Sequence, residues 1–172
     1  MRRPALIVLS RALLIAALGA LAACAPPPIY KADASVVTAT PQQVAAAPNP
    51  YPQAQVIWGG TIIGVNNLSN RTDLEILAYP LDASQRPRLK SEALGRFIAE
   101  MPGFVEPMNY PDGAPVTLRG RITGTRTGLV DQATYVYPIV FVHSGDLHLW
   151  TPREMDQGHP HFSFGVGVGV IR

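Results

Sequence analysis

The sequence predicts an all-β fold, a small antiparallel barrel of five or six strands with little helix. The first reason is its turn content. The 172 residues include 17 prolines and 15 glycines, which suits short strands joined by tight turns and is too many for a helix bundle. The second reason is side-chain alternation, clearest over residues 116–125, where apolar or small residues alternate with polar ones as in a half-buried antiparallel strand. The β-rich part spans about 95 residues, enough for one barrel domain.

The first 23 residues have the pattern of a cleaved signal peptide. Arg2 and Arg3 give a positive start, and the uninterrupted apolar run over residues 12–22 is too short to cross a membrane. Residues 21–24 read Leu-Ala-Ala-Cys and resemble the bacterial lipobox. We therefore expect cleavage before Cys24 and acylation of its sulfur and its new amine, and several acyl chains together anchor a protein stably. The alternative is an ordinary cleaved signal followed by an incidental cysteine.

Residues 24–54 are predicted to form a tether between the lipid and the folded domain. Seven prolines stand among Ala, Gln and Thr, no hydrophobic period is present, and proline removes backbone N–H donors. Such a segment is expected to be semi-extended, at roughly 3 Å per residue where it is polyproline-like. It would then hold the domain several tens of ångströms from the membrane. A Pro-rich ligand for a partner is the less favoured alternative.

The folded domain is expected over residues 55–150. Its first strand carries glycines at 59, 60 and 64, which indicate a bend or a bulge. Polar turns separate most of the following strands, including a turn over residues 127–133. The strands are predicted, in order, at residues 55–66, 74–81, 116–125, 135–142 and 146–150. These are too few for a membrane-spanning barrel, which needs at least about eight.

Residues 91–101 are ambiguous between helix and strand. Leu94, Phe97, Ile98 and Met101 follow helical spacing, yet Gly95 lies within the run and costs about 1 kcal/mol in a helix. As a strand from Gly95, the segment would place Phe97, Ala99 and Met101 on one face. The pattern alone does not decide.

The C-terminal tail is predicted at residues 151–172. Residues 151–160 are polar and read as irregular. Residues 161–172 alternate with period two, with Phe and Val on one face and mostly glycine on the other, as in a strand that another backbone approaches closely. Docking on the domain or disorder is favoured over a dedicated partner site.

Charge and motifs exclude several functions. Of 14 basic side chains, Arg2, Arg3 and Arg11 lie in the expected signal, so 11 remain against 12 acidic ones, and no basic excess indicates nucleic-acid binding. No nucleophile elbow, phosphate loop or acid–base pair is present, so we expect no catalytic residues, no cofactor and no enzymatic activity. A metal site is disfavoured, because firm binding needs three or four converging ligands. The chain's histidines are His143, His148, His159 and His161.

Aromatic residues are spread over several predicted strands. Core packing is the favoured interpretation, and a ligand-recognition face on the barrel is the alternative. The set comprises Trp58, Tyr79, Phe97, Tyr135, Tyr137, Phe141 and Trp150.

The domain also resembles a known family. The matching stretches are residues 56–60 (VIWGG), 74–82 (LEILAYPLD), 95–99 (GRFIA), 103–107 (GFVEP), 137–140 (YPIV) and 147–150 (LHLW). In this order they look like the Slp family of outer-membrane lipoproteins, named for a starvation-inducible member. The resemblance implies a Gram-negative outer-membrane lipoprotein, tilts residues 95–101 toward strand, and tilts the barrel toward an OB-like arrangement. It brings no catalytic residues.

Together these features predict an outer-membrane lipoprotein with a non-enzymatic envelope role. Ala25 after the cysteine favours the outer membrane over the inner one by the lipoprotein sorting pattern, and the domain is expected to face the periplasm. The expected partners are membrane lipid, through acylated Cys24, and another envelope protein or a cell-wall component. A glycan- or small-ligand-binding module that uses the aromatic face is the alternative.

Overall fold

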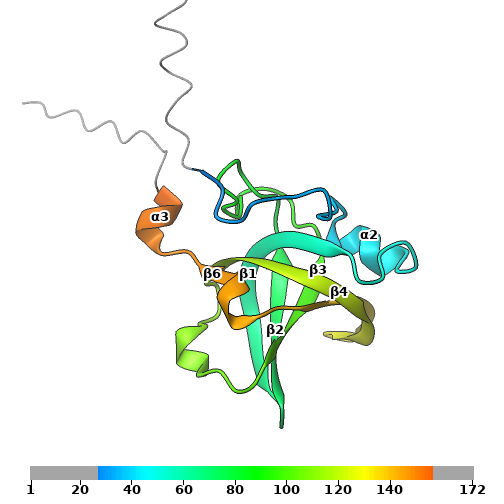
Figure 1. Ribbon diagram of the computed structural model, residues 1–172. Helices are drawn as coiled ribbons and strands as arrows, with labels where there is room; N and C mark the ends of the chain where they lie inside the picture. Colours follow the sequence, from blue (N-terminus) through cyan, green and yellow to red (C-terminus); the bar gives the residue numbers. More distant parts are fainter. Residues whose placement is uncertain (1–26, 157–172) are drawn as a thin grey trace, which may run out of the picture. The chain divides into compact units, whose positions relative to one another are not determined.

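The described part of the chain is built mainly from β-strands (Figure 1). The computed structural model describes residues 27–156. Its strands are β1 Gln55–Asn67, β2 Arg71–Ala78, β3 Arg96–Pro102, β4 Pro115–Val130, β5 Ala133–Phe141 and β6 Leu147–Leu149. Short helices are α2 Pro41–Ala46, α3 Pro152–Asp156 and the 3-10 turns η1 Pro107–Asn109 and η2 Ser144–Asp146. The predicted all-β class is confirmed.

The strand pairings form a cycle. β1 pairs with β2, β2 with β3, β3 with β5, β5 with β4, and β4 again with β1, while β6 adds to β4. All pairings are antiparallel except β3–β5, which is parallel, so the prediction of purely antiparallel strands is wrong at this one pair. β1 has an irregular register between Ile62 and Gly64, which confirms the bulge expected from its glycines.

Alternate residues of the strands form one hydrophobic core. Trp58 packs edge-on against Phe97, with ring centroids 5.1 Å apart, and Leu74, Leu118 and Val140 are fully buried around them. Two glycines let backbones approach closely. A Cβ at Gly60 would lie 1.9 Å from the Leu77 carbonyl oxygen, and one at Gly120 would lie 2.4 Å from Val140 Cγ1. No side chain larger than hydrogen fits at either position.

Residues 96–102 form strand β3, so the helical alternative for residues 91–101 is wrong. Gly95 has φ +102°, a left-handed conformation that favours glycine and separates the preceding loop from the strand. Phe97, Ala99 and Met101 are all buried on one face, as the strand alternative required.

The prediction of a semi-extended linker is wrong for the later part of residues 24–54. Residues 41–46 form helix α2, and its Val44 is fully buried in the core. The Trp58 indole Nε1 donates to the Ala39 carbonyl at 2.8 Å, and the Val37 amide donates to Gln55 at 2.8 Å. Pro41 occupies the first turn of α2 behind a Thr40–Gln43 capping box, where proline starts a helix rather than breaking it.

Two other local predictions are also corrected. Residues 127–130 belong to β4, not to a turn, and the hairpin to β5 turns at Asp131 and Gln132. Asp131 has φ +53°, a conformation that Asp tolerates in tight turns. Residues 152–156 form α3 instead of irregular chain, while residues 157–172, including the alternating tail, lie outside the described residues.

The strands, α2 and both 3-10 turns belong to one compact unit, residues 26–151, and α3 lies outside that unit. Among the residues that the structure describes, no helix has the length and apolarity needed to cross a bilayer.

Candidate functional site

The sequence-predicted site residues are only partly within the described region. Cys24, the expected lipidation site, lies outside it, as do His159 and His161, so acylation stays a prediction. His143 packs edge-on against Phe141 at 5.0 Å, and His148 against Trp150 at 4.5 Å between centroids. Within residues 27–156, no three potential metal ligands of the His, Cys, Asp or Glu type come together.

Most of the predicted aromatic set serves as packing. Trp58, Phe97, Tyr137 and Trp150 are all buried, and the Trp150 indole donates to the Thr117 hydroxyl at 2.9 Å. The other three rings, Tyr79, Tyr135 and Phe141, are half-buried. The Tyr135 hydroxyl accepts from the Arg96 amide at 2.8 Å, which ties β5 to the start of β3. The buried rings stabilise the domain.

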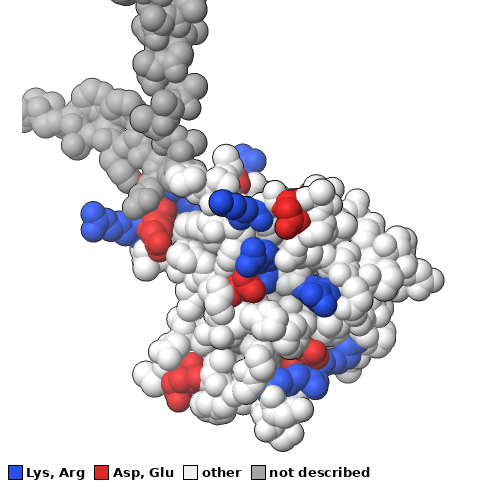
Figure 2. Space-filling model, viewed as in Figure 1, with Lys and Arg blue, Asp and Glu red and all other residues white. Residues whose placement is uncertain are grey.

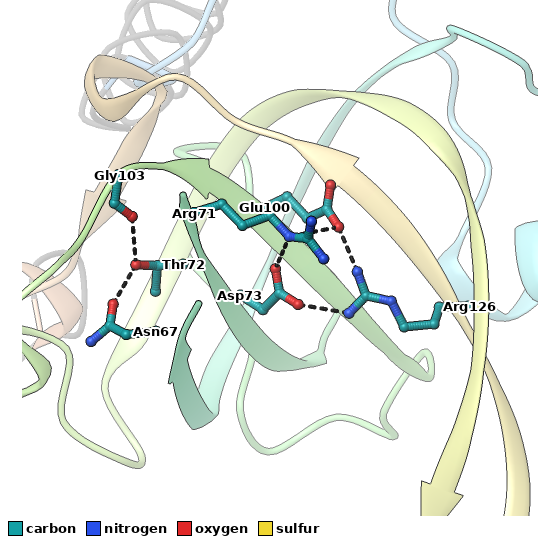
Figure 3. Close-up of polar contacts among 7 residues, drawn as sticks. All are labelled: Asn67, Arg71, Thr72, Asp73, Glu100, Gly103 and Arg126. Atoms are coloured by element: carbon teal, nitrogen blue, oxygen red, sulfur yellow. Dashed lines mark hydrogen bonds and ion pairs between the residues drawn. The ribbon is translucent and has the colours of Figure 1, made fainter. Parts of the chain in front are cut away.

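A network of paired charges covers the outward face of β2, β3 and β4 (Figure 3). Arg126 donates to Asp73 Oδ2 and to Glu100 Oε1, both at 2.6 Å. Arg71 Nε donates to Asp73 Oδ1 at 3.0 Å and lies 3.4 Å from Glu100. The Asp73 side chain is only 7% exposed, so its charge depends on these partners. Two cations neutralise two anions, and the network is structural.

A second polar group in Figure 3 joins two loops at one end of the sheet. The Thr72 hydroxyl lies 2.5 Å from Asn67 Oδ1 and 2.9 Å from the Gly103 carbonyl. Asn67 Nδ2 also donates to the Val105 carbonyl at 3.0 Å. These bonds fix the end of β1 to the loop after β3.

The charged side chains of the domain lie mostly in pairs of opposite sign. On the face shown in Figure 2, Lys and Arg side chains lie beside Asp and Glu side chains in small groups, without a broad area of one sign. Ion pairs of the domain include Arg86 with Asp82, at 2.8 Å, and Arg119 with Asp146, at 2.6 Å. This distribution agrees with the balanced charge expected for the secreted chain.

A cavity of about 170 Å³ opens on the outward face of β1, β4 and β5. Strand register places Arg121 between Gln55 of β1 and Phe141 of β5. Arg121 is exposed and takes part in no ion pair within residues 27–156. The wall is formed by Gln53, Gln55, Arg119, Gly120, Arg121, Thr123, Phe141, His143 and Asp146. The alternation of β4 had already placed both arginines on the polar face, but it gave no sign of their neighbours on β1 and β5.

Tyr30 fastens the N-terminal segment to the domain beside this cavity. Its amide donates to Gln85 Oε1, and Gln85 Nε2 donates to its carbonyl, both at 2.8 Å. The Arg119 guanidinium lies 5.5 Å from the centre of the Tyr30 ring. Burial and the negative charge of Asp146 raise the pKa of Tyr30 to about 12, although the positive charge of Arg119 acts in the opposite direction. Sequence reasoning missed this contact, because Tyr30 and Gln85 are 55 residues apart and neither belongs to a motif.

Comparison with known proteins assigns the chain to a family. A family model described as the outer membrane lipoprotein Slp family matches residues 21–166. Outer membrane protein Slp of Escherichia coli (strain K12) is 32% identical over 108 residues, which cover 63% of this chain and 56% of that protein. Uncharacterized lipoprotein YeaY of the same organism is 36% identical over 107 residues, covering 60% of this chain and 55% of that protein. The chain spans about half the length of the curated relatives it matches.

A solved structure, Schizosaccharomyces pombe Pot1pC bound to single-stranded DNA, overlaps 64% of this chain and 83% of that chain at 12% identity and a TM-score of 0.30. So weak an overlap carries no conclusion about ligand or function. The family match covers most of the sequence, and it agrees with the stretches that indicated the same resemblance. The chain therefore belongs to the outer membrane lipoprotein Slp family, and it is a lipoprotein of the outer membrane.

Proposed function

We propose that this protein is a non-enzymatic component of the outer membrane whose folded unit faces the periplasm, held by lipid on Cys24. Its role is to bind another envelope component, either a protein or the cell wall, or to support membrane integrity under starvation stress. No residue is assigned to catalysis. We further propose that the cycle of five paired strands is a small OB-like barrel, since OB-folds are five-stranded Greek-key barrels.

This proposal rests on the position at which the N-terminal chain is attached to the domain. Tyr30 is held by two hydrogen bonds to Gln85, and residues 36–54 pack onto the sheet. Tyr30 lies six positions after Cys24, and a chain of six residues reaches no more than about 20 Å when fully extended. A lipid on Cys24 therefore keeps the barrel beside the membrane, which suits a protein that acts on its immediate surroundings in the envelope.

Crosslinking in living cells tests this role. A photoreactive residue is placed at exposed positions of the full-length, lipidated protein, including Met108, which is 85% exposed, and Thr127 on β4. A recurrent protein or cell-wall adduct from one face is the expected result. Turnover of a substrate that depended on one side chain would overturn the non-enzymatic role.

Binding of a glycan or small ligand through an aromatic face is the second candidate function. The observation in its favour is Phe141, which is half-buried and lines the cavity beside Arg121. The support is narrower than the sequence suggested, because four of the seven rings are buried. Replacing Phe141 with Leu should weaken retention of the protein on a peptidoglycan column if this function holds, whereas unchanged retention would count against it.

A further inference from the structure

The cavity between β1, β4 and β5 lies beside the point where the chain from the lipid anchor reaches the domain. Arg119 and Asp146 line the cavity, and the same Arg119 lies over the Tyr30 ring. One arginine therefore borders both the cavity and the first fastened residue of the chain. Since Tyr30 is at most about 20 Å from an acylated Cys24 along the chain, the cavity lies within reach of the membrane surface.

The residues of the cavity wall carry a net positive charge once their internal ion pair is counted, while Asp33, outside the wall, is bonded to Ser35 and acts on Arg119. Asp146 is the acidic residue in the wall, and Arg119 Nη2 and Nε both contact its Oδ1, at 2.6 and 3.1 Å. This pair is neutral as a unit. Arg121 is exposed and is in no ion pair among the described residues, so its guanidinium supplies the net charge. Guanidinium groups recognise phosphate through paired hydrogen bonds.

Further hydrogen-bond donors surround Arg121. The Gln55 side-chain oxygen Oε1 lies 2.9 Å from the Ser35 hydroxyl, and the side chain of Gln55 also carries an NH₂ group that can donate. Gln53 and His143 complete this part of the wall. Because Arg121 stands on a strand paired on both sides, at Gln55 and at Phe141, its backbone is fixed before any ligand arrives. Such preorganisation lowers the ordering cost of binding.

We propose that this cavity binds the phosphodiester headgroup of an anionic phospholipid in the leaflet that holds the protein, with Arg121 as the principal cation. This inference rests on the proposed anchoring through Cys24. The occupant follows from two features that coincide: a cation with no partner of its own in the described chain, and a position that the short Cys24–Tyr30 segment keeps at the membrane. The bound headgroup would orient the barrel with β4 and β5 toward the bilayer.

The test uses the full-length, lipidated protein reconstituted into vesicles. A photoreactive residue replaces Thr123, which is exposed and lines the cavity, and adducts are measured in phosphatidylcholine vesicles with and without labelled phosphatidylglycerol. We expect an adduct to phosphatidylglycerol that Arg121→Gln reduces about tenfold, as for loss of a hydrogen bond to a charged group. Lys90→Gln removes the same charge at an exposed position outside the cavity wall and should leave the yield unchanged.

Each contrary outcome has a separate meaning. Equal yields from wild type and Arg121→Gln, or equal losses from Arg121→Gln and Lys90→Gln, would overturn the headgroup site. Suppression of the adduct by excess inorganic phosphate would assign the cavity to free phosphate and overturn the lipid as its ligand. Failure of the protein to enter even phosphatidylcholine vesicles would instead contradict anchoring through Cys24, and thus the proposed function. The unfolding midpoint of Arg121→Gln should match wild type, because the side chain is exposed.

Discussion

Arg126 holds together charges from three strands. It stands on β4 and reaches Glu100 on β3 and Asp73 on β2, although β5 lies between β4 and β3 in the sheet. Asp73 is the most buried member, with a side chain 7% exposed, whereas Arg126 is 38% exposed. The contribution of Arg126 to the stability of the fold therefore comes from keeping the Asp73 carboxylate paired, and not from its own burial.

Replacing Arg126 with Met should lower the free energy of unfolding by about 1–2 kcal/mol, because the nearly buried Asp73 loses one of its two cations. Urea denaturation of the variant and of wild type measures the difference. Arg88→Met is the matched control, since Arg88 is exposed and forms no ion pair within residues 27–156; its effect should stay within about 0.5 kcal/mol. A loss as large in the control would show that the network adds nothing specific.

Tyr30 gives the fastening of the N-terminal segment a pH dependence. Its pKa is raised to about 12, whereas an unfolded tyrosine loses its proton near pH 10, about its ordinary pKa. Between these values the unfolded state releases a proton that the folded state keeps. The free energy of unfolding therefore has the full contribution of Tyr30 below pH 10 and loses it as the pH rises toward 12.

Tyr30→Phe should accordingly make the free energy of unfolding fall less steeply between pH 10 and pH 12. Urea denaturation at several pH values in this window measures the slope for both proteins. Tyr51→Phe serves as the control, because it removes a half-buried tyrosine hydroxyl elsewhere in the N-terminal segment. Identical slopes for wild type and Tyr30→Phe would mean that the folded and unfolded states do not differ at this residue.

Among the secondary-structure elements, strands were located correctly from the sequence where apolar and polar residues alternate along them, because this alternation reflects which side chains are buried. The glycine-rich first strand and the alternating fourth strand were both predicted, because side-chain alternation is local information. From the pattern alone β3 stayed undecided between helix and strand. Gly95 is unfavourable inside a helix, but its presence does not by itself show that a strand begins there. Its φ of +102°, which the sequence does not reveal, distinguishes the two. The extension of β4 to Val130 was missed because residues 126–130, Arg-Thr-Gly-Leu-Val, do not continue the apolar–polar alternation and none of them is buried.

The N-terminal segment shows the limit of reading prolines as breaks. Pro41 occupies the first turn of α2, a position where its fixed φ helps and its missing N–H costs nothing. A local sequence pattern also does not indicate that Val44, in a helix of six residues, is buried in the core. The candidate site has the same limit: alternation placed Arg119 and Arg121 outward, but Gln55 and Phe141 join them only through the order of strand pairing. Tyr30 joins them through its hydrogen bonds to Gln85.

Val44 is the residue by which α2 belongs to the fold. Val44→Ala should lower the free energy of unfolding of the domain by about 2 kcal/mol, since it deletes two buried methyl groups and leaves a cavity. The exposed Gln42 on the same helix provides the control, and Gln42→Ala should change stability by less than about 0.5 kcal/mol. Denaturation followed by tryptophan fluorescence reports on both, because Trp58 bonds to Ala39 next to the helix. No loss in Val44→Ala would restore the interpretation of residues 41–46 as a linker.

For the whole molecule, packing of the N-terminal segment changes the expected distance between the domain and the membrane. A free tether over residues 24–54 would allow several tens of ångströms, whereas fastening at Tyr30 leaves at most about 20 Å of chain. With Cys24 acylated as proposed, a domain held this close would be restricted in height and in orientation. It would meet lipid headgroups or neighbouring membrane proteins readily, but it would not extend far into the periplasm.

This restriction can be tested by lengthening the segment before Tyr30. Inserting 20 Gly/Ser residues between Pro28 and Ile29 adds a flexible chain with an end-to-end distance of about 25 Å without touching the bonds of Tyr30. Cysteine replaces the exposed Arg88, and because Cys24 is acylated on the proposed function, the new thiol would be the single site for a fluorescent dye. We expect energy transfer from the dye to a lipid-bound acceptor to fall clearly on insertion, because the average height of the domain rises. Equal transfer from both proteins would mean that contacts with the bilayer, and not the length of the anchor segment, set the height of the domain.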